Sequence, residues 1–147
     1  MADGNDPNTW IAKGKELTKN YEGFRSSPYK DTKGIKTIGY GFNMQANKGL
    51  PSQMDRPTAD KYFDSYYTQA ANTAQMFAGD RWGKLDDNQK AILADMAYNM
   101  HNKLFGFKNM QADLQSGDNA GVQKEMQNSN WFNQVGQRGV GDVSNWK

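Results

Sequence analysis

One short stretch of strand-forming residues, 24–44, is enclosed by helical patterns on both sides, and this arrangement constrains the fold more than any other feature. Within it, polar and β-branched residues surround the turn-forming pair Lys33-Gly34. The pattern predicts a β-hairpin with a third short strand after Gly39 or Gly41. Because the other predicted elements are helical, we expect an α+β fold in which strands and helices are segregated.

Apolar residues at helical spacing set the elements around the hairpin. They predict a first helix over residues 9–21, which leaves Glu22 at its carboxyl end. A polar loop is expected over 45–54. A long helix follows over 55–78, because Asp, Pro and Thr at its start are typical of a helix amino terminus.

Shorter helical patterns follow in the second half of the chain. A helix from Asp86 or Asp87 to Met100 is expected first, and His101 is expected to cap it. Further helices are predicted near 107–116, 118–126 and 130–135. The tail, GQRGVGDVSNWK, is too rich in glycine to predict a helix.

A length of 147 residues suits one domain with a hydrophobic core of its own. We expect a flexible lead over residues 1–8 and a single domain over 9–147. Two lobes are predicted in this domain, at about 9–55 and 80–147, with the helix at about 55–78 linking them. The fold class is therefore a mainly helical α+β domain with a small N-terminal hairpin lobe.

Composition excludes several kinds of function. Eighteen Lys and Arg against 16 Asp and Glu give a formal charge of +2 without a dense basic stripe, so no nucleic-acid partner is expected. The chain has no cysteine and a single histidine, so neither a metal nor a cofactor is expected. No secretory signal or membrane-span pattern occurs, and we expect no stable membrane insertion.

Two carboxyl groups and one hydroxyl stand out around the hairpin: Glu22, Asp31 and Thr37. A helix end followed by a chain reversal can bring both carboxyl groups together, with Asp31 and Thr37 opposite or diagonal across the ladder. Two carboxyl groups flanking a cleft are what glycoside hydrolysis requires. A carboxyl at the negative end of a helix dipole favours its protonated form, which makes Glu22 the acid and Asp31 the base.

The pair alone does not select a site, because the chain has 16 acidic residues. The whole run over 21–42, YEGFRSSPYKDTKGIKTIGYGF, resembles the catalytic segment of phage-type lysozymes, the endolysins of glycoside hydrolase family 24. That family carries Glu, an acidic residue nine positions later and Thr six positions further on, which matches Glu22, Asp31 and Thr37. LADMAYNM and NWFNQVGQR are similar to later family segments.

The resemblance implies a muramidase, which hydrolyses the β-1,4 bond between N-acetylmuramic acid and N-acetylglucosamine and so lyses bacterial cell walls. It places Arg138 opposite Glu22 as a supporting residue that would form an ion pair; the alternative is an ordinary surface arginine. Two departures are visible. Phe42 stands where the best-known members have His, and the family's C-terminal helix is shortened or replaced by the glycine-containing tail.

There are three substrate-binding candidates, of which Tyr98 depends on the same resemblance and Asn43 on its position after the Thr-Ile-Gly segment. Tyr98 would stand at the cleft wall against a sugar face, with Asn99 beside it, and Asn43 could reach a sugar amide. For Tyr98, plain core packing is the alternative reading, since an aromatic residue at helical spacing is commonly buried.

Partner and setting are expectations of the same kind. The partner is bacterial peptidoglycan, and we expect a monomer that is made in the host bacterial cytoplasm and acts in the periplasm or cell wall after release by another factor. A virion-borne lysozyme, a secreted effector, a lytic transglycosylase and an inactive wall-binding module are the alternatives. The role of Asp31 as base or nucleophile, and inversion or retention at the sugar, stay open.

Overall fold

A computed structural model describes residues 7–147 of the chain. Three strands form one antiparallel sheet: β1 (Arg25–Lys30), β2 (Lys36–Gly39) and β3 (Phe42–Asn43). The α-helices are α1 (Pro7–Glu22), α2 (Arg56–Ala78), α3 (Asp87–Met100), α4 (Lys108–Ser116), α5 (Asn119–Gln127), α6 (Asn130–Val135) and α7 (Gln137–Asn145). Two 3-10 helices, η1 (Gly79–Lys84) and η2 (His101–Gly106), precede α3 and α4. The predicted α+β class is confirmed.

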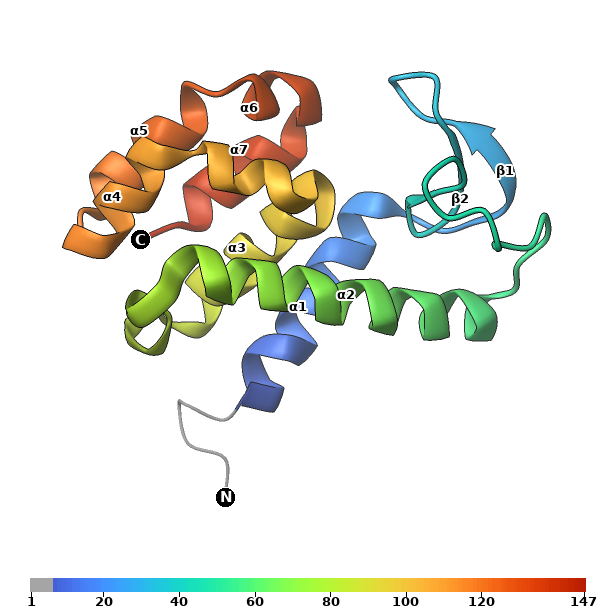
Figure 1. Cartoon of the computed structure of the whole chain (residues 1–147), viewed down its shortest axis with the longest axis horizontal. Coiled ribbons are helices and arrows are strands. Elements are labelled where there is room, and N and C mark those ends of the chain that lie inside the picture. The colour runs from blue at the N-terminus through green and yellow to red at the C-terminus, as the bar shows by residue number, and fades with distance from the viewer. Residues whose placement is uncertain (1–6) are drawn as a thin grey trace.

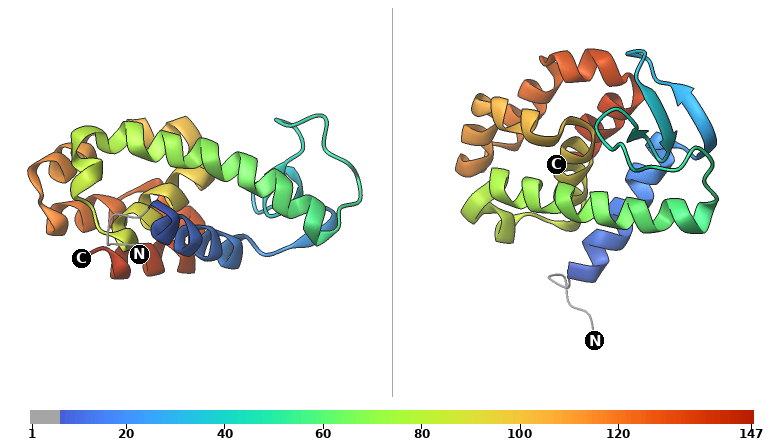
Figure 2. Two further views of the ribbon diagram at one scale, coloured as in Figure 1. Left: turned by 90° about the horizontal axis from the view of Figure 1, so that it is seen from below. Right: turned by 45° about the vertical axis from the view of Figure 1, so that its right-hand side comes forward.

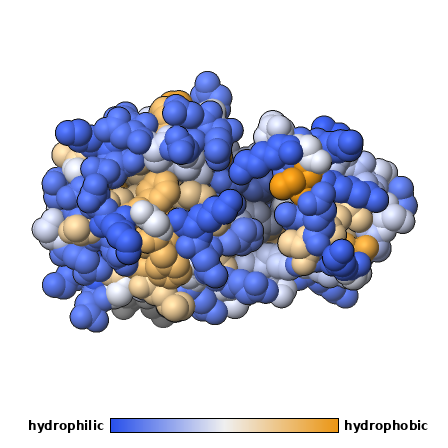
Figure 3. All heavy atoms as spheres, turned by 45° about the horizontal axis from the view of Figure 1, so that its top comes forward, coloured by the Kyte–Doolittle hydropathy of each residue, from blue (hydrophilic) through white to orange (hydrophobic). Residues whose placement is uncertain are grey.

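The sheet and the short helices lie at opposite ends of the molecule, and α2 runs along its length beneath both (Figure 1). Figure 2 shows the same separation from two further directions. In the space-filling view, two masses of unequal size are divided by a hollow (Figure 3). The helix α3 packs against α1, α2 and α7, and its residues from Gln89 to Tyr98 are all buried. It is therefore the central element of the helical end.

Side-chain caps explain where the helices begin. The Asp55 carboxylate accepts a hydrogen bond from the backbone N–H of Thr58 at 2.9 Å, and Asp86 forms a reciprocal capping box with Gln89. The predicted starts of these two helices are thus confirmed. His101 follows α3 in a left-handed conformation, and its N–H donates to the carbonyl of Ala97, so the predicted cap is confirmed as well.

The predicted hairpin and the third strand are confirmed. Tyr29 of β1 pairs with Thr37 of β2, and Thr37 in turn pairs with Asn43 of β3. The sheet contributes Ile38 and Phe42 to the core, and the turn between β2 and β3 contributes Tyr40. Phe42 packs on Tyr66 of α2 with ring centroids 5.1 Å apart, so the sheet is fastened to the long helix by aromatic contacts.

Residues 1–6 of the predicted flexible lead lie outside the described residues. α1 begins at Pro7.

The sequence did not predict a helix in the tail, but residues 137–145 form α7. Its glycines allow close packing that compensates for their low helix propensity. A β-carbon on Gly141 would collide with the Tyr21 hydroxyl of α1, and one on Gly139 would lie 3.0 Å from the Phe132 ring of α6. Trp146 directly after α7 is fully buried, so tertiary contacts hold this helix in place.

Candidate active site

Glu22 is the last residue of α1, at the junction between the sheet and the helical end. The helix stops there because Gly23 takes a left-handed conformation and donates its N–H to the carbonyl of Lys19 at 2.9 Å. The Glu22 side chain retains 15 % of its accessible surface. It is thus a mostly buried carboxyl group at the negative end of a helix dipole.

An arginine from α7 holds this carboxyl group. Nη1 of Arg138 donates to Oε2 of Glu22 at 2.7 Å. Its remaining donors face Asp95 of α3, with Nε 2.9 Å from Oδ2 and Nη2 2.7 Å from Oδ1. Arg138 is 8 % exposed, so it is not an ordinary surface arginine. The contact that the resemblance implied is present, and its catalytic support remains a prediction.

The pKa of the Glu22 carboxyl is raised above its ordinary value. Burial is the main cause, because the ionised form loses hydration. The positive charge and hydrogen bond of Arg138 oppose this shift, while the negative charges of Asp95 and Asp31 add to it. The environment therefore favours a protonated Glu22, even though its nearest charged neighbour is a cation.

The turn between β2 and β3 closes over the Glu22 carboxyl group. Gly41 lies in this turn with φ 77°, and a β-carbon there would collide with Oε1 of Glu22. Both the backbone conformation and the space therefore require glycine. Oε1 faces this turn while Oε2 faces Arg138, so the two carboxyl oxygens have different surroundings.

Asp31 is fixed by the hairpin turn. Its Oδ1 accepts hydrogen bonds from the backbone N–H groups of Lys33 and Ile35, both at 2.9 Å. Its own N–H donates to the Ile35 carbonyl at 3.0 Å. These bonds hold the carboxylate through one oxygen, and its charge is close enough to Glu22 to affect the pKa of that group.

Thr37 lies diagonally from Asp31 across the ladder, two residues beyond Ile35. It is 3 % exposed, and its hydroxyl donates to the Ile35 carbonyl at 2.8 Å. Since the hydroxyl proton is used in this way, Oγ1 can only accept a hydrogen bond from a further molecule. The geometry agrees with the diagonal placement expected from the sequence.

Residues 7–147 contain no cluster of possible metal ligands. No group of three or more His, Asp or Glu side chains in that part of the chain is arranged to hold an ion. The same residues include no helix that is both long and apolar enough to span a membrane.

A family model for phage lysozyme matches residues 19–143 of this sequence. The chain belongs to the phage lysozyme family. No curated protein matched the sequence as a relative. The matched region contains Glu22, Asp31, Thr37 and Arg138, and membership of the family implies a glycosidase of the lysozyme type that hydrolyses peptidoglycan.

The three substrate-binding candidates of this lysozyme lie in different surroundings. Tyr98 is buried, donates its hydroxyl to the Tyr40 carbonyl at 2.6 Å and packs on Phe63, as the core-packing alternative expects. Asn99 is exposed on α3. The side-chain oxygen of Asn43 accepts from the N–H groups of two following residues, at 2.8 and 3.0 Å. Contact of any of the three with a sugar remains a prediction.

The sequence did not lead us to predict the buried residues behind Glu22. Asp95 is 0 % exposed, and its Oδ1 also accepts from the Thr18 hydroxyl at 2.7 Å. Asp142, one turn after Arg138 on α7, is 1 % exposed. One signal was available: Asp95 is a lone charge within an otherwise apolar helical run, AILADMAY, and such a charge requires a buried partner.

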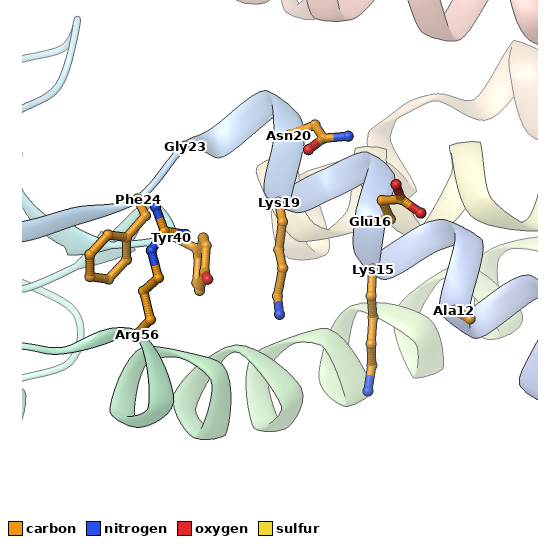
Figure 4. A pocket seen from close by; sticks show the side chains of 9 residues that line it. All are labelled: Ala12, Lys15, Glu16, Lys19, Asn20, Gly23, Phe24, Tyr40 and Arg56. Atoms are coloured by element: carbon orange, nitrogen blue, oxygen red, sulfur yellow. The ribbon is translucent and has the colours of Figure 1, made fainter.

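A hollow of about 560 Å³ elsewhere on the lysozyme does not belong to this site. It lies between α1 and the start of α2, and Lys15, Lys19 and Arg56 line it at separate positions (Figure 4). Lys19 pairs there with Asp60 at 2.9 Å, and the Tyr40 hydroxyl donates to the same carboxylate. Lys19 is thus paired within the fold, and none of the three predicted catalytic residues lines the hollow.

Proposed function

We propose that the protein is a muramidase of glycoside hydrolase family 24, which hydrolyses the β-1,4 bond between N-acetylmuramic acid and N-acetylglucosamine in bacterial peptidoglycan. One observation carries the proposal. Glu22 is a mostly buried carboxyl with a raised pKa, anchored by Arg138 across from the hairpin that bears Asp31. Glycoside hydrolysis requires a protonated carboxylic acid and a second carboxylate, and here the hairpin carries the second group.

In the proposed reaction Glu22 protonates the leaving oxygen. Oε2 of Glu22 accepts from Arg138, so the acidic proton resides on Oε1, next to Gly41. Transfer of this proton to the glycosidic oxygen lets the bond between that oxygen and the anomeric carbon break. Positive charge then develops on the sugar, and ionised Glu22 is stabilised by the Arg138 guanidinium.

Asp31 and Thr37 would act on the other side of the bond. Because backbone N–H groups occupy Oδ1 of Asp31, its Oδ2 is the oxygen available to a water molecule or to the developing cation. A water could donate one proton to this oxygen and the other to Oγ1 of Thr37, whose own proton is held by Ile35. Asp31 then acts as base toward water, or as nucleophile or stabiliser toward the sugar.

We infer a phage endolysin as the biological setting. The enzyme would be made in the host bacterial cytoplasm, reach the periplasm or cell wall through another factor and act as a monomer without metal or cofactor. Membership of the phage lysozyme family supports this setting.

Replacement of the acid tests the proposal. Glu22→Gln keeps the size and the acceptor for Arg138 but has no acidic proton, so clearing of purified peptidoglycan should fall by about 10³-fold or more. Glu16→Gln, an exposed residue on the same helix, is the matched control and should retain activity. Circular dichroism checks that both variants are folded. A folded, active Glu22→Gln would refute the proposal.

The products and the pH dependence refine the reaction. Mass spectrometry distinguishes hydrolysis, which adds water, from a lytic transglycosylase reaction, which leaves an anhydro sugar. NMR of the first-formed anomer separates inversion from retention. Since the acid must be protonated, kcat/KM should fall as pH rises through the raised pKa of Glu22, that is, above the ordinary range of about 4.3.

A further inference from the structure

Behind Glu22, two buried carboxyl groups lie close together. Asp95 of α3 and Asp142 of α7 are 0 % and 1 % exposed. Asp95 accepts three hydrogen bonds, two from Arg138 and one from Thr18. Among the described residues, neither carboxyl oxygen of Asp142 accepts a hydrogen bond from a donor. The two carboxyl groups are thus buried to the same extent, but only Asp95 accepts hydrogen bonds from Arg138 and Thr18.

Charge balance requires a proton in this cluster. Arg138 supplies one positive charge, and Glu22, Asp95 and Asp142 could supply three negative ones. A buried carboxylate without a donor is strongly disfavoured, whereas a neutral carboxyl group brings its own donor. Asp142 has Asp95 within hydrogen-bonding reach as an acceptor.

The ionisation of the two groups follows from these contacts. Burial, together with the charge of Asp95 and the hydrogen bond to it, raises the pKa of Asp142 to about 10. Burial alone would raise the pKa of Asp95 too, but Arg138 and the bonds from Asp142 and Thr18 lower it below its ordinary value. At neutral pH Asp142 is therefore the protonated member and Asp95 the ionised one.

We propose that Asp95 and Asp142 hold a single proton between them and act as a positioning pair for Arg138, and through it for the acid Glu22. The proposal rests on the function proposed above. Asp142 donates to Asp95, and Asp95 fixes Nε and Nη2 of Arg138, which directs Nη1 toward Glu22. Asp95 also offsets the arginine charge, so that Arg138 orients Glu22 without forcing it to ionise.

The groups that face this pair come from three helices. Titratable or charged neighbours are Tyr21 and Glu22 of α1, Tyr67 of α2 and Arg138 of α7, with Lys13 and Glu16 of α1 lining the hollow next to Asp142. Burial is the main cause that raises the pKa values of Tyr21 and Tyr67. Both tyrosines therefore stay neutral at neutral pH, and the proton count of the cluster is decided by its carboxyl groups.

Asp142→Asn tests the shared proton without using activity. The amide is a neutral donor to Asp95, like the protonated acid. In the natural chain, the pKa of Asp142 is higher in the folded state than in the unfolded state. The free energy of unfolding of the natural chain should therefore fall as pH rises between about 4 and about 10. The variant lacks this loss, and its urea midpoint should exceed that of the natural chain by a margin that grows over the same range. Asp80→Asn, at an exposed site on η1, should show no such margin.

Asp95→Asn tests the positioning role. Without the Asp95 charge, Arg138 acts more strongly on Glu22, so the pKa of Glu22 measured by ¹³C NMR should fall by about one unit or more, and the alkaline limb of kcat/KM should move with it. Asp142→Asn should leave this pKa and limb in place, with kcat/KM within about threefold. An unmoved Glu22 pKa in Asp95→Asn, or equal pH dependence of stability in Asp142→Asn and the natural chain, would overturn the proposal. If neither the natural chain nor any variant hydrolyses peptidoglycan, the proposed function is refuted instead. The urea midpoints and the pKa of Glu22 can still be measured in that case, so the positioning pair is tested separately.

Discussion

The hairpin side and the helical side of the site are held in place over very different distances along the chain. Asp31 and Thr37 are fixed by hydrogen bonds to residues at most four positions away. Glu22 is fixed by an arginine 116 positions away, which is itself held by a carboxylate on a third helix. A local motif therefore determines the position of Asp31, whereas the position of Glu22 depends on how α1, α3 and α7 pack.

The difference also concerns charge. On the hairpin side, Asp31 is bonded by neutral backbone donors and keeps access to solvent. On the helical side, one buried guanidinium serves two buried carboxylates. Removing a partner from a buried charge network costs far more free energy than removing one from a hydrated turn. Substitutions should thus mainly affect stability on the helical side and mainly affect turnover on the hairpin side.

The largest loss of stability is expected for Arg138→Met. It leaves Asp95 buried without its cation, so the free energy of unfolding, measured with urea at pH 7, should fall by about 3–5 kcal/mol. Arg138→Lys should recover only part of this, because one ammonium cannot replace the fork between Asp95 and Glu22. Lys108→Met, at an exposed position on α4, should stay within about 0.5 kcal/mol. If Arg138→Met and Lys108→Met were equally stable, the stability of the helical side would not depend on the buried charge network.

Gly41→Ala is expected to have the next largest effect, because it lies where the two sides meet. Its control is Gly34→Ala: φ is 77° at Gly41 and 78° at Gly34, so each change should cost about 1–2 kcal/mol of backbone strain. Only Gly41→Ala also introduces a methyl group against Glu22, whereas nothing lies within 4 Å at Gly34. Release of reducing ends should therefore fall much further for Gly41→Ala; similar activities would show that Glu22 moves freely.

A smaller stability change is expected at Asp31. Asp31→Asn keeps an oxygen for the two turn N–H groups, so its unfolding free energy should change by less than about 1 kcal/mol although turnover is lost. Asp31→Ala loses both bonds and should cost about 1–3 kcal/mol. Thermal unfolding and kcat/KM measured side by side separate the two roles. If Asn and Ala destabilise equally, the carboxylate does not anchor the turn.

The smallest stability effect is expected for Thr37→Val. The Ile35 carbonyl keeps its bond from the Asp31 N–H when the hydroxyl is removed, so the loss should be below about 1 kcal/mol. Turnover should nevertheless fall if Oγ1 accepts a bond from the attacking water. Thr37→Ser, which keeps the hydroxyl, should remain active, and a fully active Thr37→Val would remove Thr37 from the catalytic set.

Local patterns made much of the fold predictable. Helix caps such as Asp55 and Asp86, and the β-forming residues around the turn at Lys33-Gly34, act over a few residues and are visible in the sequence. The helix in the tail could not be predicted, because its glycines permit contacts that no local rule contains, such as that of Gly141 with Tyr21. Propensity describes an isolated helix, while α7 exists through its packing.

The same division applies to the site. Asp31 and Thr37 follow from a hairpin register, and the position of Glu22 follows from a helix end. The contact between Arg138 and Glu22 could be expected only through the family resemblance, because a separation of 116 residues has no local signature. Asp142 could not be predicted, since a carboxyl group four residues after an arginine usually indicates an exposed helical ion pair.

The contact between α1 and α7 also has a consequence for biosynthesis. A ribosome synthesises Glu22 before Arg138, which emerges 116 residues later and after most of the other helices. Until then Glu22 has neither its anchor nor the buried surroundings that favour its protonated form. A nascent or truncated chain that ends before α7 therefore carries the hairpin half of the site, but its Glu22 lacks the contact with Arg138.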